Sequence, residues 1–507
     1  MAGSEPRVWK TDPDNRLLEM AVFANVAGEP VLAGVLTFQG RRGGQRQGTF
    51  RYDPSWKSGD ARPLFAHGLP VRKVVQSLPP HEVPLPFYDA SPDGWGKAVL
   101  GMAYPDIQLG APEFIAASGN DRVGNLQFGP NSSGPAIWVP TAPMLELPGD
   151  EDSLADLMDA ADAFEEGVAT RSHLAKLLDS GADIGGARPK ARIQVDGEPW
   201  IVKMQATGDR FDVQRVEAAC LSAAADAGIE TPEHRVVTVG GRSALLLKRF
   251  DRCGATRFPY TSAATVLEYP PSMYRPENAS YADIAIQAKR VGIADCSRLL
   301  FARMLLNCFL NNTDDHLHNH GFIDDGSGWR LSPVFDVVPQ VQRALVLRPA
   351  RGRSAEADPH KALLAHDGFG IDRAEAQEIF ASVLKGVASL PDWLAHHGVS
   401  DRDREILAMM MPHTALSRPT VVPGHDIAPA VPPYPVDTHE AVIKSGVVAI
   451  YRKSADASHP ILDNPVGPAV VSADKTTWAI NGEKMSEDEW RQHPEVVARL
   501  GPPSPRP

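Results

Sequence analysis

The first part of the chain places hydrophobic residues in short alternating runs. Residues 18–26 and 31–38 have the period of strands, with a turn over residues 28–30 between them, and residues 49–52 form a third run. Residues 91–100 have the pattern of a capped turn that enters a helix. A stretch rich in proline, glycine and serine then predicts a boundary near residue 150. We therefore predict a β-rich amino-terminal subdomain over residues 1–150.

The middle of the chain switches between the two periodicities. Helical spacing covers residues 152–166, 172–180 and 212–227, and Glu217 lies on or near the apolar face of the last of these. Strand-like runs lie at 191–195, 200–204, 235–239 and 243–247. The order of these features is that of a kinase amino lobe: a glycine-rich turn, a strand with a lysine, a helix with a glutamate and then two further strands. We predict such a lobe over residues 151–252.

The next part is predicted to be a mainly helical carboxyl lobe over residues 253–418. The stretch from 340 to 412 has mostly helical patterning, and residues 322–331 resemble a hairpin. Helices are expected at 281–291, 297–310, 374–387 and 401–411.

Clustered prolines mark a linker over residues 419–435, and residues 436–507 are predicted to form a small appended module. Its expected elements are strands at 440–450, 467–471 and 477–480, a turn at Asn481 and Gly482, and a helix over 486–499. The predicted fold class of the whole chain is α+β.

Composition narrows the possible partners and compartment. The 507 residues carry a formal net charge of −12 and a pI near 5.7, which argues against direct tracking of nucleic-acid phosphates, so DNA contact is expected only through a partner. The first 14 residues are polar and no run of 18 apolar residues occurs, which favours a cytoplasmic protein without a membrane span. The four cysteines lack C-x-x-C spacing and predict neither a zinc site nor a disulfide framework.

The strongest chemical signal is a dense polar stretch over residues 311–320, followed by Phe335 and Asp336. Asp314 and Asn319 have the five-residue spacing of a kinase catalytic loop, in which the Asp receives the substrate hydroxyl proton and the Asn binds magnesium. Asp336 adds an oxygen ligand of the hard kind that magnesium prefers. These residues predict a site for phosphoryl transfer.

Residues upstream could complete this site. Gly185 and Gly186 lie in a predicted turn, where glycine allows backbone N–H groups to approach an anion. Lys203 lies in an apolar strand and is the obvious cation for Glu217. Taken alone, a glycine pair followed by a lysine is more typical of a hairpin turn with a solvated lysine. The order of all these features along the chain is what favours a phosphate site.

Three other interpretations stay open. The acidic and histidine residues at 314, 315, 316, 318 and 320 could bind a transition metal, as in a His/Asp metallohydrolase. The same cluster could be a solvated helix cap, where Asn and Asp are common. The chain could also be a kinase-like binding module that transfers no phosphate.

Four motifs are specific enough to indicate a family. They lie at residues 185–190, 248–252, 312–319 and 332–336, with weaker likeness at 91–96 and 121–124. Together they resemble the HipA-like serine/threonine kinase toxins of bacterial type II toxin–antitoxin systems, over about residues 17–412. The resemblance implies a protein-kinase-like two-lobe fold. It also implies a kinase that inhibits growth by phosphorylating a cellular protein, such as an aminoacyl-tRNA synthetase.

By this resemblance Asp314 would be the catalytic base, and Asn319 and Asp336 would bind Mg²⁺. The cofactors would be ATP and Mg²⁺. The partner would be a HipB-like helix-turn-helix antitoxin that binds operator DNA, and a silent kinase-like module would act with the same antitoxin. The residues expected to bind ATP are Gly185, Gly186, Ala187, Lys190, Lys203, Glu217, Lys248, Arg249, Phe250 and His316.

The sequence departs from the family in two places. Some members are silenced by autophosphorylation of a serine just before the glycine pair, and the nearest equivalent here is Asp183, which puts that control in doubt. Residues after 435 do not belong to the family core, and the sequence assigns them no chemistry.

Overall fold

The computed structural model describes residues 8–40, 46–58, 62–78, 80–140, 153–180, 188–269, 278–414 and 416, together with parts of 439–493. The chain divides into two compact units, residues 1–416 and 417–507. The boundaries predicted inside the first unit stay predictions. Among the described segments, no helix combines the length and the apolar character needed to cross a membrane.

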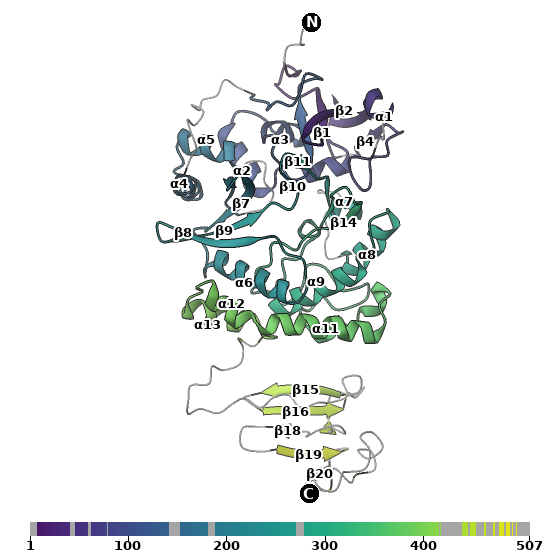
Figure 1. The fold of residues 1–507 in the computed structure, drawn as a ribbon, viewed down its shortest axis with the longest axis vertical. Coiled ribbons are helices and arrows are strands. Elements are labelled where there is room, and N and C mark those ends of the chain that lie inside the picture. The colour runs from purple at the N-terminus through teal and green to yellow at the C-terminus, as the bar shows by residue number, and fades with distance from the viewer. Residues whose placement is uncertain are drawn as a thin grey trace. The chain divides into compact units, whose positions relative to one another are not determined.

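A five-stranded antiparallel sheet, in the order β4-β3-β2-β1-β5, forms the amino-terminal part of the first unit (Figure 1). The hairpin of β1 and β2 and the third strand β3 confirm the predicted strands. A helix was also predicted after residue 91, and α2 confirms it. The elements are β1 (Glu19–Val26), β2 (Glu29–Gly40), β3 (Arg46–Tyr52), α1 (Pro54–Ser58), β4 (Val75–Gln76), α2 (Gly94–Ala103), α3 (Ala111–Ala117) and β5 (Leu126–Gly129).

A four-stranded antiparallel sheet, β6-β7-β9-β8, forms the middle of this unit. Alternate residues of β9 contribute to different cores, because side chains alternate across a strand. Leu246 packs with residues of α2, α4 and α5, whereas Leu245 belongs to the core that contains α6. Lys203 pairs in register with Leu245 and therefore faces α6. The elements are α4 (Leu154–Glu165), α5 (Arg171–Ser180), β6 (Lys190–Val195), β7 (Glu198–Met204), α6 (Val213–Asp226), β8 (His234–Val239) and β9 (Arg242–Lys248).

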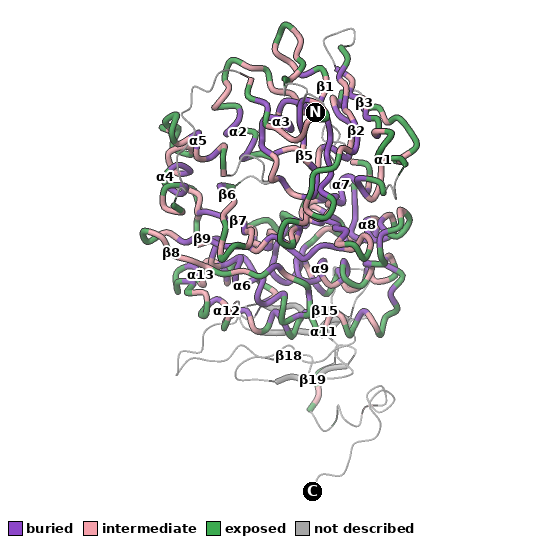
Figure 2. Tube along the Cα trace, turned by 45° about the horizontal axis from the view of Figure 1, so that its top comes forward, coloured by how far each residue is buried: buried purple, intermediate pink, exposed green. Residues whose placement is uncertain are grey.

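The rest of the first unit is mainly helical and surrounds α9 (Ser297–Leu310), which is buried over most of its length (Figure 2). The predicted hairpin is present as β13 and β14, and β12 pairs with β13. The other elements are β10 (Arg252–Cys253), β11 (Thr256–Arg257), β12 (Tyr260–Ser262), α7 (Ala263–Val266), α8 (Tyr281–Arg290), β13 (Gly321–Asp324), β14 (Trp329–Leu331), α10 (Pro359–Leu363), α11 (Arg373–Ala388), α12 (Leu390–His396) and α13 (Asp401–Met410).

The expectation of mostly helical structure from residue 340 was wrong for residues 340–358. This stretch has no helix, and the next helix begins at Pro359. Its backbone groups bond partly to the polar loop and partly to one another without a helical pattern. Gln340 N donates to Asn311 O (2.9 Å), Val346 N donates to Asp315 Oδ1 (2.6 Å), and Leu345 N donates to Ala355 O (2.7 Å). Apolar spacing alone cannot reveal such bonds, because they join segments that are far apart in sequence.

The second unit contains an antiparallel sheet in the order β15-β16-β18-β19-β20, with β17 paired to β16. The run predicted as one strand at 440–450 is divided between β15 and β16. The predicted turn at 481–482 and most of the predicted helix at 486–499 lie outside the described residues. The strands are β15 (His439–Lys444), β16 (Val447–Arg452), β17 (Ile461–Leu462), β18 (Val470–Val471), β19 (Thr476–Ile480) and β20 (Glu483–Met485).

Candidate functional site

The ammonium group of Lys203 lies between two carboxylates. Its Nζ is 2.7 Å from Oε1 of Glu217 on α6 and also contacts Oδ1 of Asp336. Lys203 is 8% exposed and Glu217 is 2% exposed, so each charge would be costly without its partner. The structure thus brings together three residues that the sequence places at 203, 217 and 336.

Burial and neighbouring charges act against each other in this group. Burial lowers the pKa of Lys203, but the charges of Asp336 and Glu217 outweigh it and hold the pKa above its usual value. Burial raises the pKa of Asp336, yet Lys203 and Lys190 hold it well below its usual range. Burial raises the pKa of Glu217, although Lys203 opposes this shift. A protonated Lys203 beside an ionised Asp336 is the result.

Lys190 lies next to this group on the neighbouring strand. It pairs in register with Lys203 across β6 and β7 and is 4% exposed. Burial lowers the pKa of Lys190, while the charge of Asp336 acts in the opposite direction. The predicted phosphate-binding residues that precede it, Gly185, Gly186 and Ala187, lie outside the described residues, as does Asp183.

The predicted catalytic loop is closed by a short 3₁₀ helix, η4 (Leu317–Asn319). Nδ2 of Asn319 donates to the backbone O of Asp314 (2.7 Å), and Asn319 N donates to His316 O (2.9 Å). The five-residue spacing therefore closes a turn. Leu317 is buried, whereas Asp314 is exposed.

Asp336 has a left-handed backbone, with φ of 55°. For a residue with a side chain this conformation is sparsely populated and is found mainly where function or neighbouring bonds impose it. Its backbone O accepts a hydrogen bond from Nδ2 of Asn312 (3.3 Å). After burial and the two lysines, His316 also contributes to the pKa of Asp336 by lowering it, so this imidazole is within electrostatic reach of the carboxylate.

Two aromatic rings connect Asp336 with the segment that follows β9. Phe250 stacks on Phe335, with centroids 5.9 Å apart and planes at 22°. This places Phe250, which was predicted to bind ATP, beside the residue that precedes Asp336. Phe335 was not among the predicted site residues, although its place directly before Asp336 could have indicated it.

Lys248 and Arg249 point to other partners. Nζ of Lys248 lies 3.8 Å from Glu198 and 3.7 Å from Glu233, and its side chain is 37% exposed. Arg249 is buried and donates to both carboxylate oxygens of Asp251 (each 3.0 Å). The structure does not connect these two cations with Lys203, and their contact with ATP stays a prediction.

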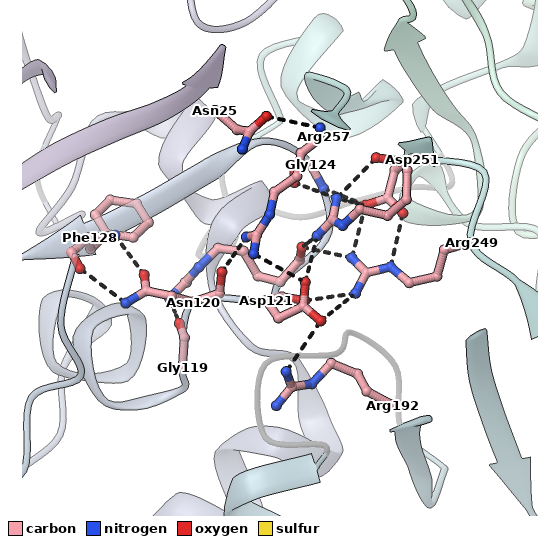
Figure 3. A network of polar contacts seen from close by, with 12 residues as sticks. Asn25, Gly119, Asn120, Asp121, Gly124, Phe128, Arg192, Arg249, Asp251 and Arg257 are labelled. Carbon is pink, nitrogen blue, oxygen red and sulfur yellow. Dashed lines mark hydrogen bonds and ion pairs between the residues drawn. The ribbon is translucent and has the colours of Figure 1, made fainter. Parts of the chain in front are cut away.

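Arg249 belongs to a network that ties the amino-terminal subdomain to the strands after β9 (Figure 3). Its guanidinium donates to the backbone O of Asp121 (2.8 Å), and Asp251 Oδ2 accepts from Gly124 N (2.8 Å). Arg252 and Arg257 also reach the Asp121 carboxylate, at 3.1 and 3.6 Å. Burial raises the pKa of Asp251, but Arg249 and Arg252 hold it well below its usual range.

Asp336 and Asn319 are the residues predicted to bind Mg²⁺, and their binding of the ion stays a prediction. In the described residues no group of three or more His, Cys, Asp or Glu side chains could hold a metal ion. The histidines at 316 and 318 instead pack edge to face, with centroids 6.0 Å apart. One carboxylate and one amide oxygen suit an ion that keeps several waters and phosphate ligands.

Comparison with known proteins shows what this chain is similar to. The family model described as HipA-like C-terminal domain matches residues 182–390. The match spans β6 to α11 and contains Lys203, Glu217, the polar loop and Asp336. The sequence-based resemblance to HipA-like proteins is thereby confirmed.

Solved structures extend the likeness beyond this domain. The HipA of Shewanella oneidensis MR-1, in a complex with HipB and operator DNA, is 16% identical, with a TM-score of 0.56 over 78% of this chain and 95% of that chain. This likeness shows a shared fold, and the predicted α+β, kinase-like two-lobe fold is confirmed. The Helicobacter pylori proinflammatory kinase CtkA is 12% identical, with a TM-score of 0.29 over 42% of this chain and 93% of that chain. No match was found among proteins of curated function.

Sequence reasoning missed Tyr281 and Asn307, which the structure connects with Asn312 of the polar stretch. The side chains of these three residues form a series of hydrogen bonds, in which Tyr281 comes from the start of α8 and Asn307 from the last turn of α9. Asn307 follows the apolar run Met304–Leu306 in α9, and a polar residue at a buried position is the one signal that could have found it.

Proposed function

We propose that this HipA-like protein is an ATP- and Mg²⁺-dependent serine/threonine kinase that acts as the toxin of a type II toxin–antitoxin system. The observation that supports this most is the position of Lys203 Nζ between Glu217 and Asp336. In kinases a lysine steadied by a helix glutamate pairs with the nucleotide phosphates, and a nearby Asp holds the metal. The same three residue types meet here.

In this proposal Asp314 orients the substrate hydroxyl and accepts its proton. Its exposed side chain and the bond from Asn319 to its backbone O support that role. Lys203 binds phosphate oxygens, and Glu217 keeps the ammonium group in place. Lys190 and residues 185–187, which precede Lys203 in the sequence, would face the phosphates, while Phe250 would flank the adenine.

Asn319 and Asp336 would hold Mg²⁺ together with phosphate oxygens. When bound, the ion neutralises charge on the transferred phosphoryl group. Asp336 is suited to this role because Lys203 and Lys190 keep it ionised across the physiological pH range.

The proposed partner is a HipB-like helix-turn-helix antitoxin, and the proposed compartment is the cytoplasm. The partner is supported by the HipA-like domain and by the HipB and operator DNA in the Shewanella structure. The net charge of −12 agrees with DNA contact through that partner alone. The proposed substrate is a cellular protein whose phosphorylation inhibits growth, for which an aminoacyl-tRNA synthetase or another translation factor is the first candidate.

A competing function is a catalytically silent kinase-like module that binds the antitoxin. Incubation of the purified protein with γ-labelled ATP, Mg²⁺ and bacterial lysate separates the two. The kinase predicts label on a specific protein, and this label requires both Mg²⁺ and an intact Asp314. ATP binding with no transferred label would favour the silent module.

A further inference from the structure

A chain of buried hydrogen bonds connects Asp315 with Asp336 beneath the polar loop. Nδ2 of Asn312 donates to Asp336 O (3.3 Å) and to Oδ1 of Asn307 (3.0 Å). Nδ2 of Asn307 donates to Oη of Tyr281 (2.7 Å), and this hydroxyl donates to Oδ2 of Asp315 (2.7 Å). The four side chains are between 0% and 3% exposed.

The three bonds that run from Asn312 to Asp315 point in one direction. Each donor faces the Asp315 end, and burial raises the pKa of Tyr281 well above its usual value, so the phenol keeps the proton that it donates. A series of an amide, a second amide and a phenol that ends on a carboxylate is polarised along its length, which strengthens each bond. The other carboxylate oxygen, Asp315 Oδ1, accepts from the backbone N of Val346 (2.6 Å).

Burial of this series of hydrogen-bonded polar side chains costs free energy of folding, which suggests a role beyond packing. Buried amides and carboxylates lose solvation, and apolar residues of the same volume would pack this region without that loss. What the polar side chains add is a fixed geometry between two segments. One carries Asp314, directly before Asp315, and the other carries Asp336, whose left-handed backbone needs such support.

We propose that Asp315, Tyr281, Asn307 and Asn312 form a positioning chain that holds the backbone of Asp336 in place relative to Asp314. Its effect on reaction rate rests on the proposed kinase function, whereas its effect on the two segments does not. None of the four residues touches the substrate in this proposal.

The chemistry of the chain offers a test by reversal. In Asp315→Asn the new amide oxygen stays on the backbone N of Val346 and the new NH₂ faces Tyr281, so the phenol O–H loses its acceptor. In Asn307→Asp one phenol proton lies between two carboxylates. When both changes are combined, the amide at position 315 donates to Tyr281, and the phenol donates to the carboxylate at position 307. Asn312 still donates to that carboxylate, so each bond between these four side chains is retained, with the direction of the two phenol bonds reversed.

Two measurements at pH 8 read out the effect. Hydrogen–deuterium exchange of the backbone over 312–319 and 332–338 is expected to rise about fivefold to tenfold in each single variant and in Tyr281→Phe, because one buried hydrogen bond is lost. The turnover number should fall about tenfold with the KM for ATP within about twofold. The double variant should recover most of both. Tyr52→Phe is the matched control, because it removes a buried hydroxyl bonded to Leu69 O (2.9 Å) in the distant sheet.

Three results would overturn the positioning chain. These are faster exchange in only one of the two segments, equal changes in Tyr52→Phe, or a double variant no better than its single parents. If the wild-type protein transfers no phosphate, the proposed kinase function fails, and the exchange data still decide the positioning role. If Tyr281→Phe does not fold, the reversal pair carries the test.

Discussion

Nζ of Lys203 on β7 lies 2.7 Å from Oε1 of Glu217 on α6. The helix carboxylate thus orients the ammonium group from behind. We expect Glu217→Gln to keep a neutral hydrogen-bond acceptor at this position but to hold Lys203 less firmly, because the carboxyl group of Glu217 is lost. The kcat/KM for ATP should fall about tenfold to a hundredfold.

Steady-state kinetics at several ATP concentrations checks this prediction. Glu378→Gln, an exposed change on α11, is the matched control and should behave as the wild type. Equal kcat/KM in Glu217→Gln and in the control would mean that the pair has no part in binding phosphate.

The Asp336→Asn variant separates charge from backbone conformation. Asparagine tolerates the left-handed φ of 55°, so the fold should be retained, whereas the carboxylate that contacts Lys203 is lost. We expect phosphate transfer to fall about a hundredfold or more and the half-saturating Mg²⁺ concentration to rise. A Mg²⁺ titration of the rate measures both. An unchanged titration curve in a folded variant would exclude Asp336 as a metal ligand.

The network around Arg249 predicts a change in stability. The side chains of Arg249 and Asp251 are 1% and 5% exposed, so Arg249→Leu leaves a buried carboxylate with less compensation. The free energy of unfolding should fall by about 3–5 kcal/mol, as measured by urea denaturation.

Arg353→Leu breaks an ion pair in which both partners are largely exposed and is the matched control, with an expected loss below about 1 kcal/mol. If Arg249 instead serves ATP binding, its substitution would weaken ATP affinity and leave the urea midpoint near that of the control.

The lowered pKa of His397 predicts that the protein is less stable to unfolding at acidic pH. Burial lowers its pKa to about 4, and the neighbouring His396, His234 and Arg215 add to this shift. Its ordinary pKa is about 6.5, so the unfolded chain takes up the proton first. The contribution of His397 to stability is therefore fully present above about pH 6.5 and is lost as the pH falls towards about 4.

The measurement is the thermal unfolding midpoint at pH 7 and pH 4.5. In His397→Gln the midpoint should decrease less between these two pH values than in the wild type, while the exposed change His360→Gln should leave the decrease unaltered. Parallel decreases in all three proteins would show that His397 does not titrate in this way.

The sequence predicted most helices and strands, because the apolar pattern of each one lies in consecutive residues. Ala244 and Leu245 belong to two different cores, as expected for a strand that is buried on both faces. The five-residue spacing of Asp314 and Asn319 lies within a single turn, which a hydrogen bond between them closes. The contact of Lys203 with Asp336 was harder to predict from the sequence, because it joins residues that are far apart along the chain.

The remaining differences have the same physical origin. Residues 340–358 have helical spacing but form no helix, and two of their backbone N–H groups, those of Gln340 and Val346, donate to Asn311 and Asp315. Tyr281 begins α8 and carries no local sign that its hydroxyl reaches Asp315. Bonds of this kind depend on the finished fold and not on the pattern of neighbours.

The most direct test of the proposed kinase is phosphate transfer from γ-labelled ATP by the Asp314→Asn variant. Asp314 is exposed, so the change should leave folding intact and remove only the group that accepts the substrate proton. Asp392→Asn, an exposed change on α12, controls for the loss of one surface charge. We predict that the wild type and the control label a specific protein and that Asp314→Asn does not. Substantial labelling by folded Asp314→Asn would contradict the assignment.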